Sequence, residues 1–406
     1  MENQLTYPST AQDAALADPL FTPIAINGRI ARNRFVLPAM QRASFDFRPT
    51  ERMAETLRRT AEGGAGVIIS EGSAPDHPAA YWQHVFSVIG QDTLEDWRAV
   101  AESVTSTADV VFLMQLWHPG SIRLVADGMR NPYPDVPTLS PSGLVQEGRP
   151  NGVAMTRQDL EETKDAYVRS ALIAQEIGAH GIEVHSCHGY LLDQFLWHET
   201  NRRTDEYGGA TLVERAAYPA DIVAAIRAAT GPEFVISFRF SQWKEVDYTA
   251  RIAAHPDELA PFVERIERAG ANMFNVSTRR FDTPAWPELH GGRSLAAWVK
   301  GMTDVPVLAI GSVGLSTDMP HDLFDNQEPE PQIEQDLERV RRGLENRDFD
   351  LIGAGRAQIA NPGLVNQIRD RDYSGLRGFR KVRDLAGVDE HFVHTGQIVA
   401  QSRKTD

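Results

Sequence analysis

Residues 184–195, with the sequence VHSCHGYLLDQF, bring together side chains that can bind or protonate a substrate. His185 and His188 could donate hydrogen bonds to a carbonyl oxygen, with Tyr190 positioned to give a proton as charge changes there. Two other interpretations stay open: a zinc site that uses both histidines, or histidines that only satisfy backbone groups. No carboxylate or cysteine completes a convincing metal-site pattern, so we expect no metal.

The chain has a single cysteine, Cys187, which lies between these histidines. A thiol without a demonstrable base partner is expected to be a small packed residue rather than a nucleophile. One cysteine also excludes internal disulfides, cysteine-ligated iron–sulfur clusters and cysteine-based zinc clusters within one chain. This usage is typical of a reducing compartment.

The elements that must position these groups are short apolar runs alternating with amphipathic stretches. Strands are predicted at residues 34–40, 66–72, 110–118, 181–186, 234–241, 273–278, 306–312 and 351–356. Helices are predicted at residues 51–63, 93–108, 156–179, 212–230, 256–270, 294–302, 333–346 and 362–371. Helix starts are marked by capping-box spacing at Thr156 and Asp159, and in the same manner by Thr93.

The β-then-α alternation predicts the fold. Because the predicted strands are apolar on both faces and nothing indicates a switch in strand order, we expect an α/β protein with a single (β/α)8 TIM barrel. An open doubly wound sheet is the alternative. We expect residues 1–17 to form an N-terminal extension, residues 18–375 the barrel domain, and residues 376–406 a C-terminal tail.

Two stretches interrupt the alternation. Residues 119–155 contain six prolines and five glycines, which predicts a long excursion after strand three that covers the barrel mouth. Residues 318–338 contain eight Asp or Glu and no Lys or Arg, which makes an extended acidic segment after strand seven. An acidic metal loop is one interpretation. We favour a helix start whose acidic first turns suit the macrodipole, with a Glu338–Arg342 ion pair.

Charge limits the partners. The net charge of −15 repels nucleic-acid backbones and anionic lipid, so we expect a small-molecule substrate and neither nucleic-acid nor membrane partners.

The first residues, MENQLTYPSTAQDAAL, lack the apolar region of a signal peptide, and the longest apolar runs are far too short to span a membrane. We therefore expect a cytoplasmic protein. The sequence does not fix the oligomeric state, and a homo-oligomer is compatible with it.

In a barrel, reactive groups come from the carboxyl ends of the strands. From strand two to strand eight these ends carry Ser70–Glu71–Gly72, Gln115–Leu116–Trp117–His118, His185, Arg239, Arg279 with Arg280, Gly311–Ser312 and Gly355–Arg356. The glycines after strands seven and eight let backbone N–H groups approach an anion, and Arg356 adds a forked cation, so a phosphate-bearing ligand is predicted. The alternative is that these glycines only turn the chain and Arg356 pairs with a carboxylate.

The chain resembles the old yellow enzyme family of FMN-dependent ene-reductases from about residue 18 to about residue 373. The most specific stretch is residues 184–209, VHSCHGYLLDQFLWHETNRRTDEYGG, which is similar to the family's HxxHGY followed by NRRTDEYGG. The resemblance implies an FMN cofactor, NADH or NADPH as hydride donor, and reduction of an activated C=C bond. It implies that His185 and His188 bind the activating oxygen of the substrate and that Tyr190 is the proton donor.

The resemblance also implies a cofactor site. Gln115 would bind the flavin's pyrimidine edge, Arg239 would lie near its N1, and Gly72 would meet it by backbone. The remaining residues would hold the phosphate or pass beside the ring system: Gly311, Ser312, Gly355 and Arg356 for the phosphate, and Ala39, Met40 and Gln41 for the rings. Arg279, with Arg280, could attract a carboxylate substrate or the extra phosphate of NADPH; its alternative is an ion pair with Asp282 or Glu288.

The chain departs from the family pattern where many members have Pro-Met-Thr and this sequence has Ala39, Met40 and Gln41. The missing threonine hydroxyl bears on the flavin potential, so a desaturase or demethylase running oxidatively is an alternative function. A non-catalytic flavin-binding barrel and a metal-dependent barrel hydrolase are two more. The lack of a cysteine cluster excludes the larger family members that carry an iron–sulfur centre.

Overall fold

The computed structural model describes residues 18–41, 44–83, 86–125, 130–289, 291–316 and 330–384. The predicted N-terminal extension, residues 318–329 of the acidic segment and most of the predicted tail lie outside these ranges. The domain boundaries after residues 17 and 375 therefore stay predictions.

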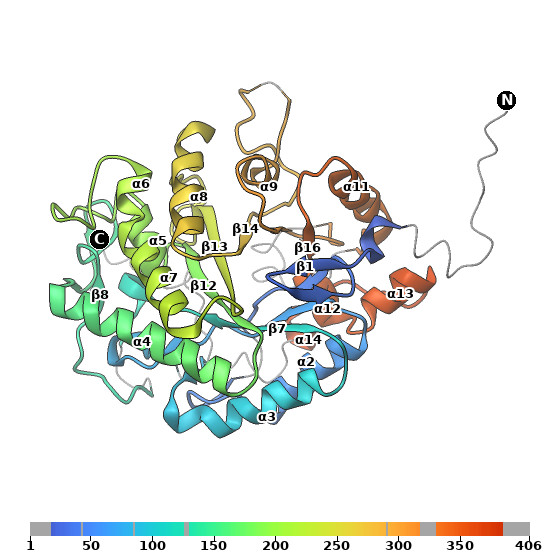
Figure 1. Ribbon diagram of the computed structural model, residues 1–406, viewed down its shortest axis with the longest axis horizontal. Helices are drawn as coiled ribbons and strands as arrows, with labels where there is room; N and C mark the ends of the chain where they lie inside the picture. The colour runs from blue at the N-terminus through green and yellow to red at the C-terminus, as the bar shows by residue number, and fades with distance from the viewer. Residues whose placement is uncertain are drawn as a thin grey trace.

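Eight parallel strands form a closed barrel, so the predicted (β/α)8 fold is confirmed and the open sheet is wrong (Figure 1). The strands are β3 (Phe35–Leu37), β4 (Val67–Ile69), β7 (Val111–Leu116), β12 (Gly181–His188), β13 (Val235–Lys244), β14 (Met273–Ser277), β15 (Val307–Ile310) and β16 (Leu351–Gly353). The barrel closes where β16 pairs with β3. Each strand falls within or overlaps a predicted apolar run, because a strand between barrel interior and helices is buried on both faces.

Helices surround the barrel and bury their apolar faces against it (Figure 1). The main ones are α2 (Glu51–Glu62), α3 (Leu94–Thr105), α4 (Arg157–Glu176), α7 (Ala217–Thr230), α8 (Leu259–Arg268), α9 (Leu295–Lys300), α11 (Ile333–Glu345) and α13 (Leu364–Asp370). The helix predicted over residues 212–230 is two helices, α6 (Leu212–Arg215) and α7. The break follows from Pro219, which has no N–H to donate to the carbonyl four residues earlier.

The two predicted helix caps differ. Thr156 and Asp159 form the expected capping box of α4. Thr93 precedes α3, but its hydroxyl donates to the Val88 carbonyl at 2.7 Å and accepts from the Gly90 N–H, so it does not cap the helix. Thr93 is the last residue of a 3-10 turn, Gln91–Thr93, that directly precedes α3. In this turn the Thr93 side chain is directed back to Val88 and Gly90 rather than to the helix.

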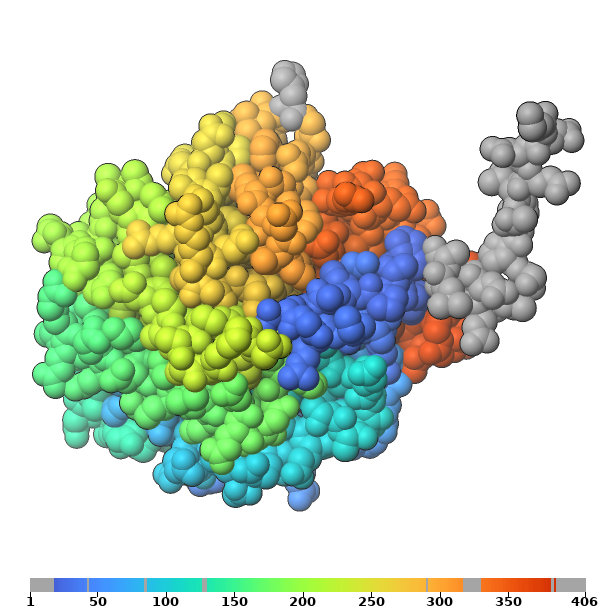
Figure 2. All heavy atoms as spheres, in the orientation of Figure 1, coloured from blue at the N-terminus to red at the C-terminus, as the bar shows by residue number. Residues whose placement is uncertain are grey.

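A hairpin closes the amino end of the barrel. Its strands β1 (Ile24–Ile26) and β2 (Arg29–Ala31) place Ile26 and Ala31 in the same apolar cluster as the inward-facing barrel residues. Asn27 at its tip donates to the carbonyl of Phe234, just before β13 begins. The hairpin lies in front of the barrel strands in Figure 1, and its atoms reach the centre of the same face in Figure 2. The reactive groups at the other end are thus separated from this face by a filled interior.

Residues 119–155 leave the barrel as predicted and form small sheets of their own: β8 (Leu139–Ser140) with β11 (Val153–Ala154), and β9 (Leu144–Gln146) with β10 (Arg149–Pro150). The buried Arg123 holds this excursion by donating to three carbonyls, those of Tyr81, Tyr133 and Val136. Ser121 N–H donates to Gln194 Oε1 at 3.0 Å, so the excursion contacts the segment that follows β12.

The described part of the acidic segment is the start of α11, as the favoured interpretation expected. Asp336 is buried, accepts the Gly314 N–H at 2.6 Å and pairs with Arg339. The expected Glu338–Arg342 pair is replaced by a Glu338–Arg341 contact of 3.5 Å, one residue closer along the helix. None of the helices in the described ranges is both long enough and apolar enough to cross a membrane.

Candidate active site

The end of β12 brings the three predicted catalytic groups together. His188 adopts a left-handed conformation with φ 64°, Gly189 follows with φ 87°, and Tyr190 then directly precedes the short helix α5 (Leu191–Leu196). This turn folds the chain back toward His185. The ring centroids of His185 and His188 lie 5.4 Å apart, as do those of His185 and Tyr190.

Helix α5 and strand β13 fix this turn from two sides. Asp193 accepts the Gly189 N–H at 2.6 Å, and Gln194 Nε2 donates to the Gly189 carbonyl at 2.6 Å. Lys244 Nζ then donates to Asp193 at 2.8 Å inside the protein. The sequence did not predict Asp193 or Lys244, because strand five was expected to end at residue 241 and no local signal pairs the two.

His185 is 5% exposed, and its Nδ1 is buried without a hydrogen-bond partner among the described residues. Burial, and then the nearby Arg239, lower the pKa of His185 well below its usual value, and the same causes act on the pKa of His188. Both imidazoles are therefore neutral near pH 7, and each has one N–H to donate.

A polar chain connects His188 to the opposite side of the mouth. His188 Nε2 lies 2.8 Å from Ser277 Oγ, and Arg239 Nη2 donates to the same hydroxyl oxygen at 3.3 Å. Arg239 Nη1 donates to the carbonyl of Ala39, which follows β3, at 3.4 Å. Trp243 stacks on the His188 ring at 4.3 Å, from an irregular stretch where β13 changes register against β12. Ser277 and Trp243 were not predicted.

The residues expected at the cofactor lie after β3, β4, β15 and β16, near the carboxyl end of β7 and within β13. A Cβ on Gly72 would lie 2.8 Å from Gln115 Oε1, and a Cβ on Gly355 would lie 2.6 Å from Met40 Sδ. Arg356 Nη2 donates to Ser312 Oγ at 2.7 Å, which joins the turns after β15 and β16. These close approaches explain the glycines, since any side chain there would displace a neighbour.

Arg279 lies after β14 with its guanidinium 4.8 Å from the centre of the Tyr248 ring. Tyr248 in turn packs on Trp243, so Arg279 belongs to the aromatic side of the mouth. The Asp282 carboxylate, one of its two expected alternative partners, pairs with Arg339 at 2.6 Å. Arg280 does not follow Arg279: its Nη1 donates to the Ser316 carbonyl at 3.5 Å.

Stacked aromatic rings line the side of the mouth next to Tyr190. Phe86 stacks on Trp117 at 4.4 Å, and Trp82 lies 5.6 Å from Phe86. The Trp117 ring meets Tyr190 edge-on at 5.1 Å. Trp117 was noted only as part of a strand end, and Trp82 and Phe86 fall in a loop whose sequence has no periodic pattern.

Among the described residues, one group could hold a metal ion: His185, Cys187 and His188, whose ligand atoms lie within 4.8 Å of one another. We expected no cysteine to complete a metal-site pattern, but the structure places the Cys187 thiol close to both histidines. The electrostatics oppose a cation, however. Burial raises the pKa of the Cys187 thiol well above its usual value, and Arg239 adds positive charge beside both imidazoles.

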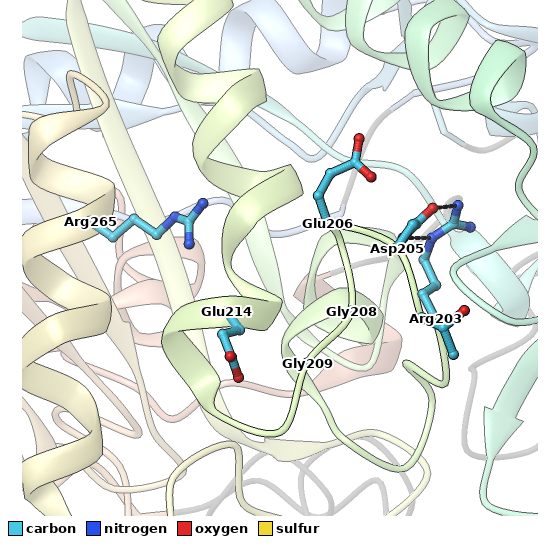
Figure 3. Close-up of a pocket in the computed structure, with 8 residues that line it drawn as sticks. Arg203, Asp205, Glu206, Gly208, Gly209, Glu214 and Arg265 are labelled. Carbon is cyan, nitrogen blue, oxygen red and sulfur yellow. Dashed lines mark hydrogen bonds and ion pairs between the residues drawn. The ribbon is translucent and has the colours of Figure 1, made fainter.

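The NRRTDEYGG segment forms a loop with its own pocket, of about 340 Å³ (Figure 3). Arg203 pairs with Asp205 and also donates to the Met155 carbonyl, which ties the loop to the excursion. Asn201 Nδ2 donates to the carbonyls of Phe195 and Tyr207. The segment therefore anchors the end of α5, and none of the predicted site residues lines the pocket.

Comparison with known proteins agrees with this architecture. The model of the NADH:flavin oxidoreductase / NADH oxidase family matches residues 19–329. Enoate reductase 1 of Kluyveromyces lactis is 28% identical over 381 residues, which cover 87% of this chain and 88% of that protein. An NADH oxidase of Thermoanaerobacter brockii is 28% identical over 374 residues, and the chain spans about half (52%) of its length.

Among solved structures, the Old Yellow Enzyme from Pichia sp. AKU4542 superposes with a TM-score of 0.71, covers 91% of each chain and is 24% identical. That likeness establishes the shared fold. The family model matches well over half of the 406 residues, including the strand ends from β3 to β15 that form most of the mouth. The chain therefore belongs to the NADH:flavin oxidoreductase / NADH oxidase family, the family of the old yellow enzymes.

Proposed function

We propose that the protein is an FMN-dependent oxidoreductase that takes hydride from NADH or NADPH and reduces the activated C=C bond of a small α,β-unsaturated carbonyl compound. Relatives named enoate reductase and 12-oxophytodienoate reductase support this direction. The single observation that carries the proposal is the His185 ring. It is buried at the mouth beside His188 and Tyr190, and its Nδ1 is buried without a hydrogen-bond partner among the described residues.

The residues of the mouth fit an FMN cofactor. Gly72 and Gly355 leave room where a side chain would collide with Gln115 and Met40. The Nε atom of Arg239 is buried without a hydrogen-bond partner among the described residues, as expected of a cation that awaits a ligand. The phosphate would be held by Arg356 with Ser312, Gly311 and Gly355, and the rings would pass Ala39, Met40 and Gln41. When bound, FMN supplies hydride transfer between the nicotinamide and the alkene.

The two imidazoles polarise the substrate. Each neutral ring donates one N–H to the carbonyl oxygen, and a preplaced donor of this kind is worth about 10²–10³ in rate. For His188 to donate through Nδ1, its Nε2 must accept. Ser277 can supply that proton, because its oxygen already accepts from Arg239, which only donates.

Tyr190 completes the addition by giving its hydroxyl proton to the substrate carbon, a contribution of about 10²–10⁴ in rate. The Trp117 ring packs edge-on against the phenol, and the stack from Trp82 to Trp117 keeps water from this side. Arg279 on the opposite side would attract a carboxylate of the substrate or the extra phosphate of NADPH.

Anaerobic stopped-flow absorbance tests the proposal on the yellow protein. Tyr190→Phe should leave flavin reduction by NAD(P)H nearly intact and slow reoxidation by an enone, because only the second step needs the phenol proton. Tyr133→Phe, which alters an exposed tyrosine of the excursion, is the matched control and should change neither rate. Equal slowing of both steps in Tyr190→Phe would remove this residue from the mechanism, and a colourless protein would reject the flavin.

One relative favours a second candidate function. The N,N-dimethylglycine/sarcosine dehydrogenase of Chromohalobacter salexigens is 28% identical over 88% of this chain and 52% of that protein. Together with Gln41 in the place of threonine, it supports an oxidative reaction such as demethylation. In that case an N-methylated amine, rather than NAD(P)H, would bleach the flavin in the absence of oxygen.

A further inference from the structure

A carboxylate lies in the interior of the barrel beneath the mouth. Glu183 of β12 is fully buried and accepts three hydrogen bonds: from Gln115 Nε2 at 2.7 Å, Asn275 Nδ2 at 2.7 Å and Ser237 Oγ at 3.0 Å. The donors belong to β7, β14 and β13, and Glu183 is in register with both Gln115 and Ser237. No lysine or arginine of the described chain forms an ion pair with this carboxylate.

The position of Glu183 determines which way the Gln115 amide points. An amide has a donor side and an acceptor side, and a carboxylate only accepts, so Nε2 must face Glu183. Oε1 then faces the other way and lies beside Gly72, where a Cβ would meet it at 2.8 Å. Gln115 is 3% exposed, and among the described residues its side chain forms one hydrogen bond, from Nε2 to Glu183. The Gln115 carbonyl oxygen is thus presented beside Gly72, just beyond the end of β4.

We propose that Glu183 is a positioning residue that locks the Gln115 carbonyl toward the mouth, so that the site selects a ligand edge bearing an N–H donor. This inference rests on the proposed function, in which Gln115 binds the pyrimidine edge of FMN; the imide N–H of that edge is the matching donor. In the reverse orientation the Gln115 NH2 group would face an N–H, and a buried donor would lose its partner.

Exchanging the two side-chain types tests the inference without changing their number or size. Gln115→Glu alone sets two carboxylates against each other, and a buried like-charge pair is strongly unfavourable. The double variant Gln115→Glu/Glu183→Gln restores one carboxylate and one amide, with residue 183 as donor and residue 115 still presenting an acceptor. The dissociation constant of FMN is read from quenching of flavin fluorescence at pH 8.5.

We expect Gln115→Glu to weaken FMN binding about 10- to 100-fold. Adding Glu183→Gln to it should recover most of that loss, although Glu183→Gln alone gives no gain over the wild-type protein. Ser237→Ala is the matched control, because it removes one donor to Glu183 without reversing the amide; its FMN affinity should stay within about threefold of wild type.

Two results would overturn the inference. One is wild-type FMN affinity in the Gln115→Glu protein. The other is a double variant that folds, as judged by its circular dichroism and thermal transition, and binds FMN no better than Gln115→Glu. Failure of the wild-type protein itself to bind FMN is a separate outcome, which would reject the proposed function instead.

Discussion

The ammonium of Lys244 lies 2.7 Å from a carboxylate oxygen of Asp193, and neither side chain is exposed to solvent. Burial raises the pKa of Asp193 to about 6, against the opposing effect of Lys244, and burial lowers the pKa of Lys244. Because Asp193 also accepts the Gly189 N–H, this ion pair holds the turn on which His188 and Tyr190 lie.

Lys244→Met should lower the free energy of unfolding by about 3–5 kcal/mol at pH 8, because it leaves the Asp193 carboxylate buried without its cation. The double variant Asp193→Asn/Lys244→Met should lose less, since both charges are gone. Urea denaturation measures both values. Glu206→Gln, which breaks the exposed ion pair with Arg157, is the control and should leave the transition unchanged. Additive losses in the double variant would contradict a coupled pair.

The same Lys244→Met protein should reoxidise more slowly with an enone than the wild type, with a smaller effect on flavin reduction. The physical reason is that a shifted turn moves the phenol of Tyr190, which acts only in reoxidation. Single-turnover stopped-flow separates the two steps. A uniform loss in both, matching the loss of folded protein, would reduce the pair to a purely structural role.

Ser277→Ala should weaken substrate binding through His188. Without the hydroxyl, Nε2 of His188 loses the partner that keeps the ring proton on Nδ1, so the imidazole no longer donates reliably to the substrate oxygen. We expect the second-order rate constant of enone reoxidation to fall about tenfold. Ser277→Thr retains the hydroxyl and should restore most of the rate; if alanine and threonine behave alike, the hydroxyl does not set the tautomer.

The sequence predicted the barrel because its strands are apolar on both faces, and it predicted the mouth because parallel strand ends must meet at one edge. Glu183, Ser237 and Ser277 escaped notice since each lies on a predicted strand with no partner nearby in the sequence. Their roles depend on register between strands: Glu183 and Asn275, for example, are 92 residues apart in the chain. Lys244 was missed because β13 continues beyond residue 241 through an irregular stretch.

The stability of the protein should depend on pH through His118, and the burial of this ring fixes the sign of that dependence. Burial lowers its pKa well below the usual value, with His77 and Arg123 adding to the effect, so the folded protein keeps this ring neutral. Below about pH 6.5 the unfolded chain takes up a proton that the folded protein refuses, and stability therefore falls with falling pH. When the pH is lowered from 7.5 to 5.5, this one group should reduce the free energy of unfolding by about 1.4 kcal/mol.

The difference between wild type and His118→Gln isolates that contribution. Isolation is necessary because Asp193 and Glu245, with pKa values raised by burial to about 6 and about 7, bind protons in the folded state and act in the opposite direction. Urea denaturation at several pH values should show the stability advantage of wild type over the variant shrinking as pH falls. A constant difference would mean that His118 takes up a proton in the folded protein as readily as in the unfolded chain.

Gly72→Ala should weaken FMN binding while leaving the barrel folded. The new methyl group would lie 2.8 Å from Gln115 Oε1, so the amide must move from the position that Glu183 gives it, and we expect about a tenfold rise in the dissociation constant of FMN. Gly363→Ala is the matched control, because its Cβ would meet only Gln367 Oε1 at an ordinary 3.8 Å. Fluorescence titration with FMN measures both. Equal affinities in the two variants would place the cofactor away from Gln115.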